Sequence, residues 1–380
     1  MITHWRLHVG YPIGKSTYIV PAAGRARARQ GRPARHPARP EGPATGESSD
    51  ECPQTGVPYD RHMRYRTLGD SGLLVSVVGL GCNNFGGRLD VARTRAVVDA
   101  AIDEGITLLD TADIYGGGGA SELALGEVLQ GRRDQVVLAT KFGHIRGDMG
   151  YGPAAGAKGG RSYINLAVEK SLTRLKTDYI DLYQLHTPDP VTPVEETLAA
   201  LDDLVTAGKV RYIGHSNLAG WQIADAAHAA LGSGRTPFIS AQNPWSLLDR
   251  EVEKEVVPAA SHFGVGLLPY SPLANGLLTG KVRRGQQVPA NSRLAEPRQA
   301  GYITEAKLDT VEALLAWGQE QGVSLLEIAV GGLAAQPGCA SVIAGATTPE
   351  QIKANVAAGH WEPTQAQLDA IDEIVPPPGR

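Results

Sequence analysis

Four side chains suited to proton transfer follow three consecutive short apolar runs of the chain. Asp110 follows Leu108-Leu109 with Tyr115 five residues later, Lys141 follows the run 136–139, and His186 follows 183–185. Reduction of a carbonyl group by hydride transfer needs a proton donor for the oxygen, and the donor must be acidic enough near neutral pH. Tyrosine, lysine, aspartate and histidine together supply that chemistry.

Tyr115 is the expected proton donor. A free phenol has a pKa of about 10, which is high for an acid that works at neutral pH. A neighbouring Lys141 ammonium would lower that pKa, and Asp110 would keep the lysine charged and oriented. His186 would hydrogen-bond the carbonyl oxygen and fix its direction. Taken singly, the four have ordinary alternatives: a packing tyrosine, a solvated lysine, a helix-capping aspartate and a structural histidine.

Side chains from successive parallel strands converge when they stand at the carboxyl ends of those strands. Strand-like and helix-like segments alternate eight times, which predicts an α/β fold, a (β/α)8 TIM barrel. A hairpin of 65–68 and 73–78 around Gly69-Asp70-Ser71-Gly72 is expected to precede the barrel as a plug. The expected strands are 77–82, a strand ending at 110, 136–141, 180–185, 210–214, 238–241, 265–268 and 341–344. The expected helices are 92–103, 121–129, 163–175, 194–206, 219–231, 251–262, 304–321, 325–335, 349–357 and 365–374.

The composition is typical of a soluble globular protein. Hydrophobic residues make up 42% of the 380 and charged residues 20%, and the net charge is -4, which implies no bulk attraction to nucleic acid or to an anionic membrane. Cys52, Cys82 and Cys339 are too widely spaced for a disulfide framework or a metal cluster. No apolar run of about 18 residues and no secretory signal are present, so we expect a cytoplasmic protein with no membrane span.

Residues 1–62 differ from the rest of the chain. Between Pro21 and Pro43 they are nearly all Ala, Gly, Pro and Arg, and such a segment cannot bury enough apolar surface to fold. We expect a disordered extension over 1–62, with a basic arm or a targeting peptide as alternatives, and Met63 as an alternative start. The barrel is expected over 63–375 and a tail over 376–380.

Several motifs around these residues resemble the aldo-keto reductase family. They are Leu109-Asp110-Thr111-Ala112-Asp113-Ile114-Tyr115-Gly116, Ala139-Thr140-Lys141-Phe142-Gly143, Asp181-Leu182-Tyr183-Gln184-Leu185-His186, Gly214-His215-Ser216-Asn217, Ala241-Gln242-Asn243 and Pro269-Tyr270-Ser271-Pro272-Leu273. The resemblance spans about residues 64–375. It implies a TIM barrel, a catalytic tetrad of Asp110, Tyr115, Lys141 and His186, and NADPH bound in an extended pose.

The same resemblance assigns cofactor positions. Ser216, Asn217 and Gln242 match the carboxamide-binding group, and Tyr270 matches the ring that stacks on the nicotinamide. The remaining cofactor positions are Cys82, Ser271, Leu273, Ala274, Asn275, Lys281, Arg293, Gly345, Thr347, Gln351 and Asn355. Ser271, Leu273, Ala274 and Asn275 would face the pyrophosphate, whereas Lys281 and Arg293, in a long segment from Ser271 to Gly301, would clamp phosphates.

Two positions depart from the family pattern. Gln351 stands where many members have an arginine that grips the 2′-phosphate, and Gly345 stands where some have lysine. NADPH is therefore the expected cofactor, NADH is an alternative, and Arg293 or Lys353 would replace the missing charge.

Two classes of function follow from the resemblance. The first is a carbonyl reductase for a small-molecule aldehyde or ketone, acting as a monomer or a small homo-oligomer. The second is a nicotinamide-binding regulatory subunit like the potassium-channel β subunits, whose tetrad histidine position carries Asn, whereas this chain has His186. No His/Asp/Glu cluster has metal-ligand spacing, so no metal is expected. The sequence does not name the substrate.

Overall fold

The computed structural model describes residues 63–379 with the exception of 291 and 300. The expected disordered extension over 1–62 lies outside the described residues, as does Arg380. The described chain begins with an antiparallel hairpin of β1 (Tyr65–Thr67) and β2 (Leu74–Ser76). Leu68 and Val75 on this hairpin are fully buried in one cluster with Leu108 and Leu182 of the sheet. The hairpin therefore packs against the sheet that follows it.

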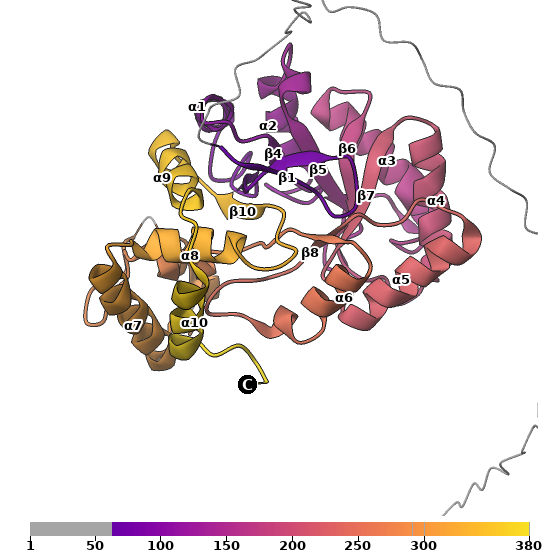
Figure 1. The fold of residues 1–380 in the computed structure, drawn as a ribbon. Coiled ribbons are helices and arrows are strands. Elements are labelled where there is room, and N and C mark those ends of the chain that lie inside the picture. The colour runs from indigo at the N-terminus through magenta and orange to yellow at the C-terminus, as the bar shows by residue number, and fades with distance from the viewer. Residues whose placement is uncertain (1–62, 291, 300, 380) are drawn as a thin grey trace, which may run out of the picture. The chain divides into compact units, whose positions relative to one another are not determined.

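Eight parallel strands form the centre of the described chain (Figure 1). They are β3 (Val78–Gly81), β4 (Leu108–Asp110), β5 (Val137–Phe142), β6 (Ile180–Leu185), β7 (Val210–Ser216), β8 (Ser240–Gln242), β9 (Gly266–Leu267) and β10 (Val342–Gly345). Their order is β10-β3-β4-β5-β6-β7-β8-β9. Parallel bridges Leu267–Cys339 and Tyr270–Ile343 join the two ends, so the sheet curls round on itself as in a TIM barrel.

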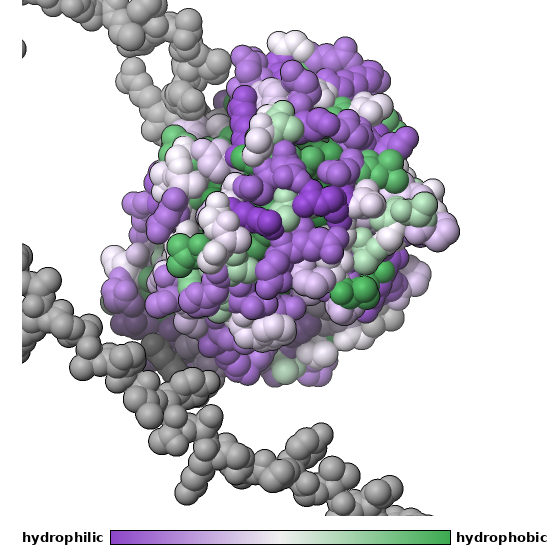
Figure 2. Space-filling view, turned by 90° about the vertical axis from the view of Figure 1, so that its right-hand side faces the viewer, coloured by the Kyte–Doolittle hydropathy of each residue, from purple (hydrophilic) through white to green (hydrophobic). Residues whose placement is uncertain are grey.

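Helices connect the strands and cover the outside of the sheet (Figure 1). They are α1 (Val91–Asp103), α2 (Ala120–Val128), α3 (Arg161–Leu175), α4 (Val194–Thr206), α5 (Gly220–Ser233), α6 (Val256–His262), α7 (Glu305–Gln321), α8 (Leu325–Ala334), α9 (Pro349–Gly359) and α10 (Gln365–Ile374). Side-chain caps fix several starts: Asp90 accepts from the N–H of Arg93, and Ser324 forms a capping box with Glu327. Figure 2 shows one face of the molecule, where hydrophobic residues are scattered among hydrophilic ones.

Two segments differ from the sequence-based expectation. The helix expected over 251–262 is divided into a short 3-10 helix, η3 (Glu251–Glu253), and α6. Pro258 explains the break, because its ring would clash with the carbonyl of Lys254 in a continuous α-helix. The long segment from Ser271 to Gly301 contains three short helices, η4 (Ala274–Thr279), η5 (Arg293–Ala295) and η6 (Pro297–Gln299).

The described residues of the long segment share an apolar cluster with α7 and α8. Leu277, Leu278 and Leu294 are buried together with residues of α7 and α8, such as Leu314 and Ile328. Spaced apolar residues therefore anchor the loop to the helices outside the barrel. Across the described residues, no helix is both long enough and apolar enough to span a membrane.

Candidate active site

The carboxyl ends of β4, β5 and β6 bring the four predicted tetrad residues together. Lys141, with no exposed surface, donates from Nζ to Asp110 Oδ2 at 2.6 Å and to Tyr115 Oη at 3.3 Å. Its third bond goes to the carbonyl of Thr111 at 2.9 Å. The Tyr115 and His186 rings meet edge-on with their centres 5.8 Å apart. The arrangement is a tyrosine hydroxyl between an ion pair and a histidine.

The chain leaves Tyr115 through a turn of four consecutive glycines, Gly116 to Gly119, all with positive φ. A side chain at Gly116 would bring a Cβ to 2.7 Å from the carbonyl oxygen of Phe85. Only glycine suits such a left-handed, crowded backbone position. The turn thus leads directly from Tyr115 into α2 and lets the tyrosine lie at the strand ends.

Two glutamines complete the surroundings of Asp110. Gln242 Nε2 donates to Asp110 Oδ1 at 2.8 Å, and Gln184 Nε2 donates to the same oxygen at 3.2 Å. Gln242 was predicted to contact the cofactor carboxamide, and its amide N–H already binds the tetrad carboxylate. Gln184 was not predicted, although it lies two residues before His186 on β6, and alternate residues of a strand share a face.

Burial and charge set the protonation states of the tetrad. Burial raises the pKa of Tyr115 above its ordinary value, and it outweighs the nearby Lys141, which acts in the opposite direction. The net direction is opposite to the lowering expected from the lysine alone. Burial by itself lowers the pKa of Lys141, but the Asp110 carboxylate and Tyr115 raise it above the usual value. Burial, and then Lys141, lower the pKa of His186 to about 2. At neutral pH the phenol is protonated, the lysine charged and the imidazole neutral.

A cavity of about 560 Å³ opens at these strand ends. Asp110, Tyr115 and His186 line it, whereas Lys141 lies behind the wall. Thirteen predicted cofactor residues also line it: Ser216, Asn217, Gln242, Tyr270, Ser271, Leu273, Asn275, Lys281, Arg293, Gly345, Thr347, Gln351 and Asn355. Its volume and its mixed polar and aromatic walls are typical of a small-molecule site.

Two predicted cofactor residues do not line the cavity. Cys82 is fully buried behind its wall, where the thiol faces the carbonyl of Leu80 and burial raises its pKa well above the usual value. Ala274 is buried as well, and its N–H donates to the carbonyl of Ser271. Their neighbours Gly81 and Leu273 form the wall instead.

Hydrogen bonds hold the residues that are predicted to bind the cofactor carboxamide. Tyr270 Oη donates to Asn217 Oδ1 at 2.8 Å, and Asn217 Nδ2 donates to the carbonyl of His186 at 3.0 Å and to Ser216 Oγ at 2.9 Å. The amide of Asn217 therefore links the Tyr270 side chain to His186 at the end of β6. At the far end, Gln351 Oε1 accepts from the N–H of Thr347 at 2.8 Å, at the start of α9.

Backbone strain is concentrated around the cavity. Five described non-glycine residues have a left-handed backbone, and four of them are Asn217, Ser271, Ala274 and Asn275. Each such residue costs of order 1–3 kcal/mol, and such strain clusters at ligand sites. The half-buried Arg293 side chain has no hydrogen bond or ion pair with any described residue, and it lines the same cavity. The strain is typical of a ligand site, and the positive charge of Arg293 would suit an anionic group there.

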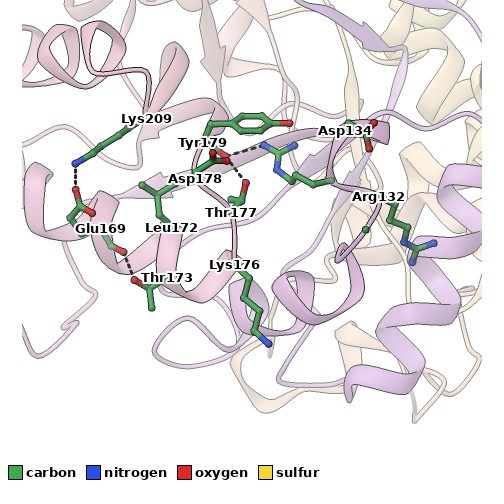
Figure 3. A pocket seen from close by; sticks show the side chains of 12 residues that line it. Arg132, Asp134, Glu169, Leu172, Thr173, Lys176, Thr177, Asp178, Tyr179 and Lys209 are labelled. Carbon is green, nitrogen blue, oxygen red and sulfur yellow. Dashed lines mark hydrogen bonds and ion pairs between the residues drawn. The ribbon is translucent and has the colours of Figure 1, made fainter. Parts of the chain in front are cut away.

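A second hollow lies at the opposite ends of the strands (Figure 3). It has about 940 Å³ and is lined by charged residues beside Tyr179. Lys209 pairs with Glu169, Lys176 pairs with Glu127, and Arg133 and Arg211 both pair with Asp181. The two arginines also stack on the faces of the Tyr179 ring, at 4.2 and 3.9 Å from its centre. These cations are compensated within the protein, so this hollow is not the candidate site.

Another polar cluster lies behind the tetrad, among α2, α3 and β5. Glu122, which is fully buried, accepts from Arg174 Nε and from Thr140 Oγ1, both at 2.6 Å. Asp113 is buried nearby, and no side chain among the described residues donates a hydrogen bond to its carboxyl group. Burial, and then Glu122, raise the pKa of Asp113 to about 7. The described residues contain no group of three or more His, Cys, Asp or Glu side chains that could hold a metal.

Comparison with known proteins agrees with this geometry. The model of the aldo/keto reductase family matches residues 77–376. "Uncharacterized oxidoreductase YrpG" of Bacillus subtilis is 37% identical over 83% of this chain and 97% of its own length. "Aldo-keto reductase YhdN" of the same organism is 35% identical over 77% of this chain and 87% of its own. "Probable voltage-gated potassium channel subunit beta" of Arabidopsis thaliana is 34% identical over 82% of this chain and 97% of its own. The family model covers most of the chain, and the parallel eight-stranded fold agrees with it. The chain therefore belongs to the aldo/keto reductase family.

Proposed function

We propose that this protein is an NADPH-dependent oxidoreductase that reduces an aldehyde or ketone to an alcohol, with Tyr115 as the proton donor. The observation that carries the proposal is the position of Lys141 Nζ, buried between Asp110 Oδ2 at 2.6 Å and Tyr115 Oη at 3.3 Å. The family, and relatives named as oxidoreductases, support the reaction class.

The cavity residues fit a nicotinamide dinucleotide. Amide side chains and the Tyr270 ring suit the planar carboxamide-bearing end, while Arg293 and Lys281 offer positive charge for phosphate groups. When bound, NADPH supplies the hydride that the carbonyl carbon accepts. Gln351 has no charge for a 2′-phosphate, so Arg293 is the proposed source of a preference for NADPH over NADH.

The protein's own contribution is to place and move one proton. The Tyr115 hydroxyl remains protonated at neutral pH because burial raises its pKa. As the carbonyl oxygen gains charge, Tyr115 donates its proton, and the Lys141 ammonium stabilises the phenolate that remains. Asp110 holds the lysine, and the neutral His186 offers a hydrogen bond that orients the carbonyl.

The alternative is a nicotinamide-binding regulatory subunit. It is favoured by relatives named as potassium channel β subunits, at 34% identity in Arabidopsis thaliana. Against it stands His186 at the position where the channel subunits carry Asn, within reach of the Tyr115 ring. Steady turnover of an aldehyde would separate the two functions.

The test measures NADPH oxidation with a panel of aldehydes, ketones, sugars and pyridoxal in the parent and in Tyr115→Phe. We expect turnover in the parent, and a loss of about 10²–10⁴-fold in the variant because phenylalanine keeps the ring but has no proton to give. Cofactor binding, followed by fluorescence quenching, should survive. Tyr302→Phe, outside the cavity, is the matched control. Turnover in Tyr115→Phe within a few-fold of the parent would exclude Tyr115 as the acid.

A further inference from the structure

A second imidazole lies beside the tetrad histidine. His144 lines the same cavity as Tyr115 and His186, and its ring centre is 4.6 Å from that of His186, nearly perpendicular to it. It stands three residues after Lys141, in the loop between β5 and α3. The roles proposed for the tetrad leave this residue unused.

The loop that carries His144 is held by two side chains that bind its backbone. Lys158 Nζ donates to the carbonyl oxygens of His144, Ile145 and Gly147, so one ammonium gathers the turn around itself. The N–H of Ile145 donates to Thr187 Oγ1 at 2.9 Å, which ties the turn to the end of β6. The backbone of the turn at His144 is therefore tied to the same strand end that carries His186.

Hydrogen bonding fixes the form of the His144 ring. Its Nδ1 accepts the N–H of Arg146 at 3.2 Å, so the ring proton of the neutral form belongs on Nε2. Burial, and then Lys158 and Arg146, lower the pKa of His144. His186 is neutral for the same reason of burial. Above neutral pH the cavity thus presents two neighbouring uncharged imidazoles, and the ring N–H of His144, which has no acceptor among the described residues, is a hydrogen-bond donor.

We propose that His144 is a specificity-determining residue that donates a hydrogen bond to a second oxygen of the substrate, on the carbon next to the reacting carbonyl. Hydrogen bonds of about 3 Å from two rings this close reach oxygens only a few ångströms apart, as on adjacent carbons. The substrates are then uncharged compounds with neighbouring oxygens, α-dicarbonyls or α-hydroxycarbonyls. The inference rests on the proposed carbonyl reduction.

The experiment compares butane-2,3-dione with butan-2-one, which share a carbon skeleton and differ by one oxygen. The readout is the ratio of their kcat/KM values with NADPH, in the parent, His144→Phe and His144→Gln. The greater intrinsic reactivity of the dione cancels when this ratio is compared between variants. We expect the ratio to fall about 10-fold in His144→Phe, which keeps a planar ring without a donor, and to recover to within about 3-fold in His144→Gln, which restores an N–H.

Three controls accompany the ratio. His228→Phe changes an exposed histidine on α5, whose ring is 5.4 Å from Phe263, and should leave the ratio unchanged. The parent ratio should also be constant between pH 7.5 and pH 8.5, because burial lowers the pKa of His144 below its ordinary value of 6.5 and the ring is neutral in that range. Thermal unfolding of each variant checks that it is folded.

The outcomes separate the two proposals. An unchanged ratio in folded His144→Phe, with both ketones still reduced, would overturn the role of His144 and leave the reductase intact. An equal fall in His144→Gln would show that ring shape, rather than the donor, sets the preference, and would also overturn it. Absence of NADPH oxidation with these ketones and with the whole carbonyl panel would overturn the proposed reductase, and this inference with it.

Discussion

Removal of the buried Lys141 alone should destabilise the fold about twice as much as removal of both members of its ion pair. Lys141 is fully buried and Asp110 is 2% exposed. In Lys141→Met, the Asp110 carboxylate keeps the amide donors of Gln184 and Gln242 but loses its only bonded cation among the described residues. An unpaired charge then remains at a position that is almost completely buried.

The distance gives the size of the effect. At 2.6 Å and an effective dielectric constant of about 20, the attraction between the two charges is about 6 kcal/mol. Desolvation of both ions offsets much of this attraction, so the intact pair adds little net stability. Loss of one partner leaves the other desolvated without compensation, which costs about 3–5 kcal/mol. Asp110→Asn in the same chain removes the stranded charge, so the double variant should recover about half of that loss.

Urea unfolding followed by circular dichroism at pH 7 measures the free energy of unfolding of the parent, both single variants and the double variant. Lys254→Met is the matched control, because its pair with Glu251 is exposed and should be worth less than about 1 kcal/mol. If Lys141→Met lost no more stability than Lys254→Met, or if the two single losses simply added in the double variant, the reasoning would be wrong.

Three further predictions concern buried charge and the cofactor. Burial lowers the pKa of His215 to about 3, below its unfolded value, so its contribution to stability is full above about pH 6.5 and is lost on acidification. Between pH 7 and pH 5 the parent should lose about 2 kcal/mol more than His215→Phe in urea unfolding; parallel curves would contradict this. Asp113 acts in the opposite direction, because burial raises its pKa to about 7 and its contribution is lost as the pH rises. The parent should therefore lose about 2–3 kcal/mol more than Asp113→Asn between pH 5 and pH 8, and an equal pH dependence would show that Asp113 does not titrate there. Arg293→Ala should weaken NADPH by at least about 10-fold in Kd and NADH by less, measured by fluorescence quenching; equal affinity of the parent for both cofactors would refute the assignment.

The sequence predicted the elements well where periodicity was long and turns were marked. Helix 194–206 and strand 180–185 match α4 and β6 at both ends. The break before α6 was missed because apolar spacing continues through it, although the ring of Pro258 is incompatible with a helix that continues back through Lys254. The short helices within 271–301 were missed because Leu277, Leu278 and Leu294 are anchored by distant helices, which local pattern does not reveal.

The sequence predicted the positions of the candidate site residues better than their pKa values. Strand-end reasoning placed Asp110, Tyr115 and Lys141 close together, since register follows from a parallel barrel. It did not give the direction of the Tyr115 pKa, because burial depends on every surrounding element and here exceeds the effect of one lysine. Cys82 shows a related difficulty. It was correctly predicted to lie at a strand end, but its side chain is buried behind the cavity wall, and the sequence pattern did not give that direction.

The left-handed residues around the cavity imply a trade-off between thermal stability and ligand affinity. At Ala274, with φ at 47°, glycine would relieve the backbone strain, and the fold would gain wherever that relief exceeds the extra freedom of the unfolded chain. The same change would loosen the loop, which would raise the entropic cost of binding the proposed cofactor. A library of variants screened by survival after heating would accumulate glycines at these left-handed positions. A library screened by turnover at low cofactor concentration would lose them. Variants recovered from the two screens should therefore differ at these left-handed positions. If a thermostabilised variant has lost its activity, a substitution at one of these positions is the first cause to test.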